Sequence, residues 1–401
     1  MNRRKFLYLT AGLPALTLSR PSCSAVSDLH QDSQNTATDS TTMQATAKFI
    51  RWVKQYQSVA GRGLYPYMAT PNAETLSTIA SAKLLLFFIK QDDIASAISI
   101  ADGLLYWLEQ GKRQSVKLLR GGLPTEIHLN QTQSLGDYYY ASDNLIAVHA
   151  FYALYQKTGQ SKYADAANNI GKWLAQGLFN GVRHGMWSVN YGPPMHYLTK
   201  AGAFDNSIHT AGDFLWLIAL KDLHALQPNQ GWLARLAKAI DFMRGAQMPS
   251  GAWYTYFKPD KKSKSGTWYG YRGDDITIGD DNLRSALAAQ QLGMAEQLIR
   301  FQHWLQPYQD TLLWGYLHTD KSTPKFLPSD VPYFDVVCTG LLRSLYHKLG
   351  RNDLAAKCQA QLNALQDSNG GWAWAVKQAD LTPLNSEHAI ITGCWALADI
   401  V

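Results

Sequence analysis

The sequence predicts an all-α fold: an (α/α)6 toroid of six helical hairpins, with short extended segments in the long loops at one end. The first observation is a Gly/aromatic segment that recurs six times from Gly63 to Gly371, in steps of 59, 63, 66, 64 and 56 residues. The second is a helical spacing of apolar residues between these segments, which gives two helices per repeat. The third is that short and long links alternate, as in a ring of hairpins.

Twelve helices are predicted, and they alternate in character along the chain. Those in even positions are apolar nearly all round, as in 214–220, which is typical of an inner layer. Those in odd positions carry more Lys, Arg and Gln, which fits an outer layer. Because every long loop precedes an even helix, the loops should gather at one end of the ring. The predicted ranges are 43–58, 73–90, 93–110, 142–157, 161–178, 207–225, 230–247, 281–292, 295–308, 335–348, 352–365 and 386–399.

Residues 1–25 have the features of a cleavable export signal. Arg3 and Arg4 precede a short apolar run ending at Leu18, and small residues before and at Ala25 provide a cleavage site. The run is too short for a permanent span and resembles a twin-arginine (Tat) signal, with the general secretory route as an alternative. Lipidation of Cys23 is a further alternative. We expect a periplasmic or extracellular protein without a stable membrane span, with a flexible leader at 26–42 and a single toroid domain at 43–401.

Composition excludes several functional classes. With 46% hydrophobic and 17% charged residues, the chain can bury a large core. Its net charge of +6 is dispersed, apart from four lysines at 258–264, which argues against nucleic-acid binding and is compatible with an acidic polymer. The cysteines have no metal-binding spacing, and no phosphate loop, Gly-x-Ser-x-Gly elbow or zincin motif occurs. No metal or cofactor is predicted, and the oligomeric state is left open.

Three segments resemble known families. Residues 155–167 are similar to the inner-to-outer turn of sugar-acting toroids, whereas 247–253 and 366–372 each run from Gln to Trp and resemble the QW motif of terpenoid cyclases. The whole mature chain resembles the six-hairpin toroid superfamily, which includes glycosidases, polysaccharide lyases and sugar epimerases, and the related terpenoid-cyclase toroids. The resemblance implies a carbohydrate-active enzyme and does not indicate one family.

Acidic residues or their amides begin the predicted inner helices. Each alone is a favourable helix cap, but as a set they should converge on one mouth, where carboxylates push each other's pKa values apart. We expect Asp143 and Asp281 to be the catalytic pair, one protonating the leaving oxygen while the other activates water or attacks the anomeric carbon. Asp275, in the acidic stretch 268–282, is the next candidate. The full set of helix starts is Glu74, Asp143, Asp205, Asp280, Asp281, Asp335 and Glu387.

Further residues are predicted to support catalysis or to hold substrate. His209 lies four residues after Asp205, which would place both on one helix face, and it would be the base of a lyase or epimerase. Basic side chains predicted to bind carboxylates or hydroxyls are His128, Arg183, His184, Arg272 and His388. Candidate stacking platforms for sugar rings, with core packing as the alternative, are Trp187, Trp253, Trp268, Trp372 and Trp374.

The preferred functional hypothesis is an exported glycoside hydrolase that acts on a poly- or oligosaccharide by paired carboxylates. The first alternative is a polysaccharide lyase or uronate epimerase in the same cleft. The second is a terpenoid-cyclase-like toroid, which needs a closed apolar cavity that shields carbocations. The third is a non-catalytic glycan-binding protein. The arrangement of acids at the mouth of the ring decides which hypothesis the structure favours.

Overall fold

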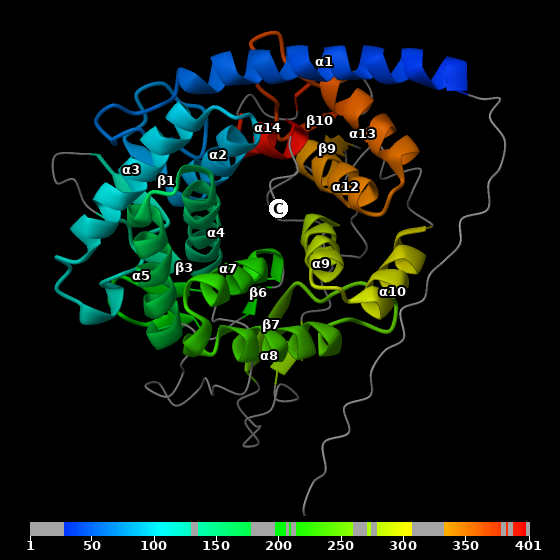
Figure 1. Cartoon of the computed structure of the whole chain (residues 1–401). Coiled ribbons are helices and arrows are strands. Elements are labelled where there is room, and N and C mark those ends of the chain that lie inside the picture. The colour runs from blue at the N-terminus through cyan, green and yellow to red at the C-terminus, as the bar shows by residue number, and fades with distance from the viewer. Residues whose placement is uncertain are drawn as a thin grey trace, which may run out of the picture.

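The helices of the chain form two concentric layers (Figure 1). The structure is a computed structural model and describes residues 28–129, 135–177, 197–205, 208–209, 214–259, 271–273, 279–306, 333–377, 382–383 and 388–397. These residues contain twelve α-helices, and none of them is long and apolar enough to cross a membrane.

The inner layer is a closed ring. Its helices are α2 (Thr78–Lys90), α4 (Ala141–Thr158), α7 (Ala219–Leu226), α9 (Gly279–Gln291), α12 (Val336–Lys348) and α14 (Ile390–Leu397). A 3-10 turn, η3 (Trp216–Ile218), precedes α7 and contacts α9. Each inner helix contacts the next, directly or through η3, and α14 packs against α2 to complete the circle.

The outer layer consists of α1 (Asp28–Lys54), α3 (Ile94–Gly111), α5 (Ser161–Gly177), α8 (Trp232–Gly245), α10 (Ala295–Leu305) and α13 (Asn352–Ala364). Two further 3-10 turns are η1 (Lys117–Leu119) and η4 (Pro228–Gln230). Each inner helix from α2 to α12 packs against the outer helix that follows it, and α1 lies against α13 and α14, so the last hairpin is completed by the start of the chain. The predicted (α/α)6 toroid is therefore confirmed.

Ten short strands form four antiparallel sheets among the described residues. The pairings are β1 (Thr75–Ser77) with β2 (Glu126–His128), β3 (Tyr138–Tyr140) with β4 (Tyr197–Thr199) and β5 (Phe204–Asp205), β6 (Ile208–His209) with β7 (Tyr256–Pro259) and β8 (Tyr271–Gly273), and β9 (Tyr333–Asp335) with β10 (Ala375–Lys377). β1, β3 and β9 run directly into α2, α4 and α12. The sheets thus join neighbouring long loops at the amino ends of the inner helices, as predicted.

The two Gln-to-Trp segments fasten each loop to the next outer helix. The Gln247 amide donates to the carbonyl oxygens of Gly251 at 2.7 Å and of Gln297 on α10 at 2.8 Å. Gln366 repeats this arrangement with Gly370 and with Ala45 on α1, both at 2.9 Å. The second set of bonds ties the end of the chain to its start. The Gln-to-Trp segments, which resemble the QW motif, therefore help to close the ring.

Glycine is required where the Gly/aromatic segments approach these helices. Gly251 has φ +105°, and a Cβ there would lie 2.2 Å from the Arg300 carbonyl oxygen. Gly370 has φ +106°, and its Cβ would lie 2.6 Å from the Lys48 carbonyl oxygen. Both the left-handed backbone and the close contact exclude a side chain. The recurrence of glycine along the sequence therefore has a steric cause.

Several element boundaries differ from the prediction. α1 begins at Asp28, so it includes most of the predicted leader at 26–42, a segment that contains no Gly or Pro to end a helix. Residues 208–209 of the helix predicted at 207–225 pair with β7 as a strand, and α7 covers Ala219–Leu226. α14 begins at Ile390, after the predicted start at 386, because residues 388 and 389 are not helical.

Candidate active site

Two tryptophans predicted to stack on sugar rings are core residues, so that interpretation is wrong for them. Trp253 and Trp372 are both 0% exposed. Their indole N–H groups donate to the carbonyl oxygens of Met243 at 3.0 Å and Leu362 at 2.7 Å, which lie on the preceding outer helices α8 and α13. Trp374 is half-buried and packs against the same core. These rings hold the loops against the helices.

Asp143 and Asp281 are each followed by an Asn that binds a Gly/aromatic loop. Asn144 on α4 accepts from the Leu123 N–H at 2.8 Å and donates to the Leu123 carbonyl at 2.9 Å. Asn282 on α9 makes the same two bonds to Trp253, at 2.6 and 3.3 Å. Both amides are 0% exposed. Because the amide makes the structural bonds, the preceding Asp143 or Asp281 side chain does not have to cap the helix.

Charged side chains of three inner helices, α2, α4 and α9, meet inside the ring. Lys83 on α2 is 3% exposed, and its ammonium lies 4.8 Å from the centroid of the Trp395 ring. Burial and, to a smaller extent, the Arg284 charge lower the Lys83 pKa to about 7, while Cys394, Asp143 and Asp280 oppose this shift. Arg284 on α9 pairs with Asp280 at 3.0 Å. The interior thus combines two cations with several carboxylates.

Asp143, in the first turn of α4, is the clearest candidate for an acid. It is 3% exposed, and Ser142 Oγ donates to its Oδ1 at 3.3 Å, whereas Oδ2 is buried without a hydrogen-bond partner among the described residues. Burial raises the Asp143 pKa to about 6, which the Glu126 charge reinforces and the hydroxyls of Thr125 and Ser142 and the Lys83 charge oppose. With this pKa, the Asp143 carboxyl is still partly protonated near neutral pH.

Asp143 lines a cavity of about 360 Å³, here called the Asp143 cavity. The same cavity is lined by a second acid, Glu126. Its remaining lining residues are two tyrosines, three hydroxyl residues and one isoleucine: Tyr67, Tyr140, Ser77, Thr125, Ser142 and Ile79. Tyr67 is 45% exposed, yet burial raises its pKa because it projects into a hollow surrounded by protein. Two carboxyl groups, two aromatic rings and several hydroxyls therefore face one space.

The alternation of β1 and β2 explains why Glu126 reaches this cavity. In the antiparallel pair, Ser77 lies opposite Glu126, Thr75 lies opposite His128, and Leu76 lies opposite Ile127. Leu76 and Ile127 are 0% exposed and point into the core. The other four side chains consequently share the cavity face. His128 Nδ1 and Thr75 Oγ1 are 3.1 Å apart, so the predicted binding histidine is held in place by its neighbour.

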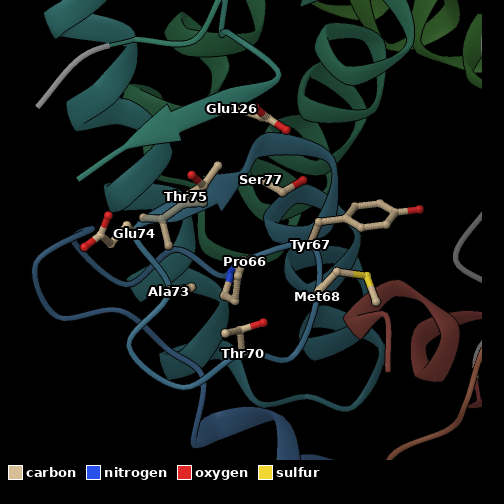
Figure 2. Close-up of a pocket in the computed structure, with 10 residues that line it drawn as sticks. Pro66, Tyr67, Met68, Thr70, Ala73, Glu74, Thr75, Ser77 and Glu126 are labelled. Atoms are coloured by element: carbon tan, nitrogen blue, oxygen red, sulfur yellow. The ribbon is translucent and has the colours of Figure 1, made fainter. Parts of the chain in front are cut away.

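A second cavity of about 420 Å³, the Glu74 cavity, continues from the first and shares Tyr67, Ser77 and Glu126 with it. Figure 2 shows Thr75 and Ser77 along β1, with Glu74 at one end of this row and Glu126 near the other. Glu74 was predicted as a helix start, but it precedes β1, and α2 begins at Thr78. The helix is capped instead by Ser77, whose side chain accepts from the Ala80 N–H.

Asp281, the predicted partner of Asp143, lies in another part of the ring. It is 4% exposed in the first turn of α9, and α7 and η3 lie between α4 and α9. Its charge acts on Arg284 and Cys338. The carboxylate that shares a cavity with Asp143 is Glu126. Of the two acids predicted as a pair, Asp143 lines this cavity and Asp281 does not.

Asp335 is a buried acid that also caps a helix. It is 1% exposed and accepts from the Cys338 N–H at 2.8 Å, at the start of α12. Burial raises the Asp335 pKa to about 7, and the Asp280 charge adds to this effect, while the Cys338 amide and the Arg284 charge oppose it. Asp335 therefore both caps α12 and has a raised pKa.

Three other predicted residues occupy different positions from those expected. Asp205 and His209 are not on one helix face, because they lie on β5 and β6, which belong to separate sheets. A spacing of four residues therefore does not by itself indicate a helix. His388 Nε2 pairs with an Asp367 carboxylate oxygen and its ring lies beside Trp52, so it ties loops together and is not free for substrate.

The remaining predicted site residues are placed only in part. Arg272 lies on β8, opposite Lys258 of β7. Asp275, Trp187, Trp268, Arg183 and His184 lie outside the described residues. Within the part of the chain that is described, no group of three His, Cys, Asp or Glu side chains is arranged to hold a metal ion.

Sequence reasoning missed Glu126, Tyr67 and Lys83. Both Glu126 and Tyr67 belong to Gly/aromatic segments. Glu126 begins β2, and Tyr67 precedes an isolated bridge at Met68. Lys83 had a usable signal, since it is a lone charge in the apolar stretch 79–89 of an inner helix. A lysine there must lie inside the ring.

Solved structures show where this architecture recurs. A cellobiose 2-epimerase from Bacillus thermoamylovorans B4167 is similar with a TM-score of 0.69 and 14% identity, over 91% of this chain and 99% of that chain. A family 76 glycoside hydrolase, a mannosidase from Bacteroides thetaiotaomicron VPI-5482, is similar with a TM-score of 0.56 and 11% identity, over 89% and 96%. A D-mannose isomerase gives 0.63 and 11%, over 90% and 97%.

Neither protein-family models nor curated protein sequences give a match. At 11–14% identity, the structural similarities establish the fold: the chain has the (α/α)6 toroid architecture of these enzymes.

Proposed function

We propose that this chain is a carbohydrate-active enzyme and, more specifically, a glycoside hydrolase whose catalytic cleft is the Asp143 cavity. The observation that carries the proposal is a buried carboxyl group of raised pKa, Asp143, in one cavity with an exposed carboxylate, Glu126. Glycosidases need such an asymmetric pair, in which one acid is protonated while the other is ionised. The fold shared with a mannosidase and a cellobiose 2-epimerase supports the carbohydrate part of the proposal.

The proposed reaction assigns one role to each group. Protonated Asp143 donates its proton to the glycosidic oxygen, and Glu126 either attacks the anomeric carbon or removes a proton from the attacking water. Tyr67 and Tyr140 supply aromatic faces and hydroxyls for the sugar. Lys83 then favours the Asp143 carboxylate that proton transfer leaves behind.

The test is an assay for new reducing ends on a panel of neutral, amino and acidic polysaccharides. Asp143→Asn and Glu126→Gln should each lower kcat by about 10²- to 10⁴-fold, the range for loss of an acid or base catalyst. Asp241→Asn and Glu109→Gln are matched controls, because these carboxylates are 70% and 58% exposed on the outer helices α8 and α3. Full activity of both site variants would refute the assignment.

The product separates the hydrolase from the alternatives in the same cleft. Ultraviolet absorbance from an unsaturated sugar would mark a lyase, and an epimerised product without new reducing ends would mark an epimerase. The raised pKa of Tyr67 argues against that residue as a base at neutral pH. The hydroxyl and carboxyl groups of the Asp143 cavity do not suit a carbocation-shielding cyclase. Binding with no product would indicate a glycan-binding protein.

We also propose that the protein is exported. The proposal rests on the twin arginine and short apolar run of residues 1–25 alone. Fractionation of cells that produce the full chain, compared with an Arg3→Lys, Arg4→Lys variant, tests it. Export that persists in the variant would exclude the twin-arginine route, and a wholly cytoplasmic protein would exclude export.

A further inference from the structure

A pair of tyrosines on β3 leads outward from the Asp143 cavity. Tyr140 lines this cavity, and Tyr138, two residues earlier, is 47% exposed. Tyr139 between them is 0% exposed and points into the core, so the alternation of the strand places the other two rings on the opposite face. Their centroids are 6.2 Å apart, and their planes are tilted by 33°. The two rings therefore form one aromatic surface, here called the Tyr138 platform.

The backbone places this platform beside Glu126. β2 is joined on one side to β1 and on the other to the segment that leads into β3, through an antiparallel bridge between Ile127 and Leu135. In the same register, the Gly136 N–H donates to the Glu126 carbonyl oxygen at 2.8 Å. The bridged side chains are 0% and 5% exposed and belong to the core. Glu126 and Tyr138 consequently lie on the other face, which is the face of the Asp143 cavity.

The charges around the cavity do not favour a substrate of either sign. Lys83 and Glu126 act on the Asp143 pKa in opposite directions. Tyr67, in the same lining, lies in the field of Arg284 and of several aspartates, which also oppose each other. Fields that cancel give little net attraction for a charged ligand. Contact between an aromatic face and the C–H groups of a sugar ring needs no charge, so the platform suits a neutral glycan.

The shape of the platform distinguishes between kinds of glycan. Pyranoses joined through equatorial bonds form an extended ribbon, in which successive rings present C–H faces at a spacing similar to that of the two tyrosines. Chains joined through axial bonds coil, so a second unit would be lifted from a surface whose two rings differ in tilt by 33°. The platform therefore fits the ribbon better than the coil.

We propose that the Tyr138 platform is a subsite for a neighbouring sugar unit, and that the substrate is an extended, β-1,4-linked chain of neutral hexopyranoses. This inference rests on the proposed function, because the unit over Tyr140 lies beside the Asp143 and Glu126 carboxyl groups. The next unit of the chain then lies over Tyr138. The protein thus binds at least two consecutive units and prefers a chain to a single sugar.

The experiment is calorimetric titration of the full-length protein with three probes whose glycosidic oxygens are replaced by sulfur, so that the wild type can be used without cleavage. The probes are methyl β-thioglucoside, the β-1,4-linked glucose tetramer and the α-1,4-linked glucose tetramer. Stacking on one further ring predicts that the β-linked tetramer binds about 3- to 10-fold more tightly than the single sugar. The α-linked tetramer should bind more weakly than the β-linked one.

Variants of Tyr138 locate the effect, and this exposed side chain can be changed without opening the core. Tyr138→Ala should weaken binding of the β-linked tetramer about 3- to 10-fold and leave binding of the single sugar unchanged. Tyr138→Phe keeps the ring and should bind like the wild type. Tyr155→Ala is the matched control and should change nothing, because Tyr152 and Tyr155 form a similar pair, with centroids 6.5 Å apart, in the carboxyl-terminal half of α4.

Several results would overturn the inference. They are equal binding of the single sugar and the β-linked tetramer, tighter binding of the α-linked tetramer, no binding of any probe, and wild-type binding by Tyr138→Ala. If Tyr138→Phe were as weak as Tyr138→Ala, the contact would belong to the hydroxyl, and the stacking subsite would be refuted.

The result for the platform is distinguishable from that for the hydrolase. Cleavage of a glycan that depends on Asp143, with the same kcat/KM in Tyr138→Ala as in the wild type, would sink only the platform. Binding of the β-linked tetramer that depends on Tyr138, with no cleavage of any glycan, would sink only the hydrolase.

Discussion

Replacement of Lys83 by methionine tests the electrostatics of the ring interior. Methionine fills a similar volume and removes the charge. The Lys83 pKa falls from 10.5 to about 7 on folding, because burial and Arg284 disfavour the ammonium ion. The folded protein therefore disfavours the charged form by a difference of about 3.5 units, which corresponds to roughly 5 kcal/mol at 1.36 kcal/mol per unit.

The sign of the effect on stability follows from proton linkage. Between about pH 7 and 10.5 the unfolded chain binds a proton at Lys83 that the folded chain releases, so this residue makes stability rise with pH. Its destabilising effect is complete below about pH 7 and vanishes above 10.5. Between pH 9 and pH 6, the wild type should therefore lose about 2–3 kcal/mol relative to Lys83→Met.

The measurement is urea unfolding of both proteins at pH 6, 7.5 and 9, followed by circular dichroism. Lys90→Met is the matched control, because Lys90 is exposed at the end of the same helix. Lys83→Met should be at least as stable as the wild type at pH 6, and the difference should shrink at pH 9. A variant that is less stable by the same amount at every pH would show that Lys83 is needed for packing and that its charge costs nothing.

Three further predictions concern the site and the loops. Activity should fall as pH rises above about 6, because Asp143 loses the proton it donates, and a pH–rate profile that stays flat to pH 8 would contradict this role. Because burial raises the Asp143 pKa, Asp143→Asn should be more stable than the wild type above pH 6 by up to about 3 kcal/mol. Asn282→Ala should cost about 2–4 kcal/mol in urea unfolding, because it leaves the buried backbone N–H and C=O of Trp253 without partners. Trp372→Ala should cost about 3–5 kcal/mol by opening a core cavity, and a loss below 1 kcal/mol would instead suggest an exposed ring.

The fold was predictable because the described hairpins repeat the same local features. The positive-φ glycines and the alternation of short and long links are properties of single segments, so they are visible in the sequence. The burial of Trp253 was not visible, because an aromatic side chain in a Gly-rich loop suits both a core and a sugar-binding groove. Only the position of the loop relative to the outer helix decides between them.

The site was predictable in part. Asp143 was identified from its place at the start of an inner helix, but its partner was not. Glu126 faces the cavity because β2 pairs with β1, about fifty residues earlier in the chain, and a strand of three residues is too short to show alternation. Lys83 was recognisable as a charge in an apolar helix, whereas the groups around it come from α4, α9 and α14 and depend on how the ring closes.

The repeated loop attachment indicates that the acids are not needed for the fold. In the first repeat, Ser81 Oγ accepts from the Tyr65 N–H at 3.1 Å, two residues after the positive-φ glycine Gly63. Asn144 and Asn282 bind Leu123 and Trp253 at the same offset, from Gly121 and Gly251.

The residue before the attaching side chain is therefore equivalent in these repeats: Ala80, Asp143 and Asp281. Ala80 is 0% exposed, so the first repeat packs at this position without a carboxylate. A buried acid of raised pKa at Asp143 destabilises the folded protein above pH 6, and the architecture does without one in the first repeat. Asp143 therefore lowers the stability of the fold at a position where the fold does not need an acid. Chemistry in the cavity that Asp143 lines best explains its presence.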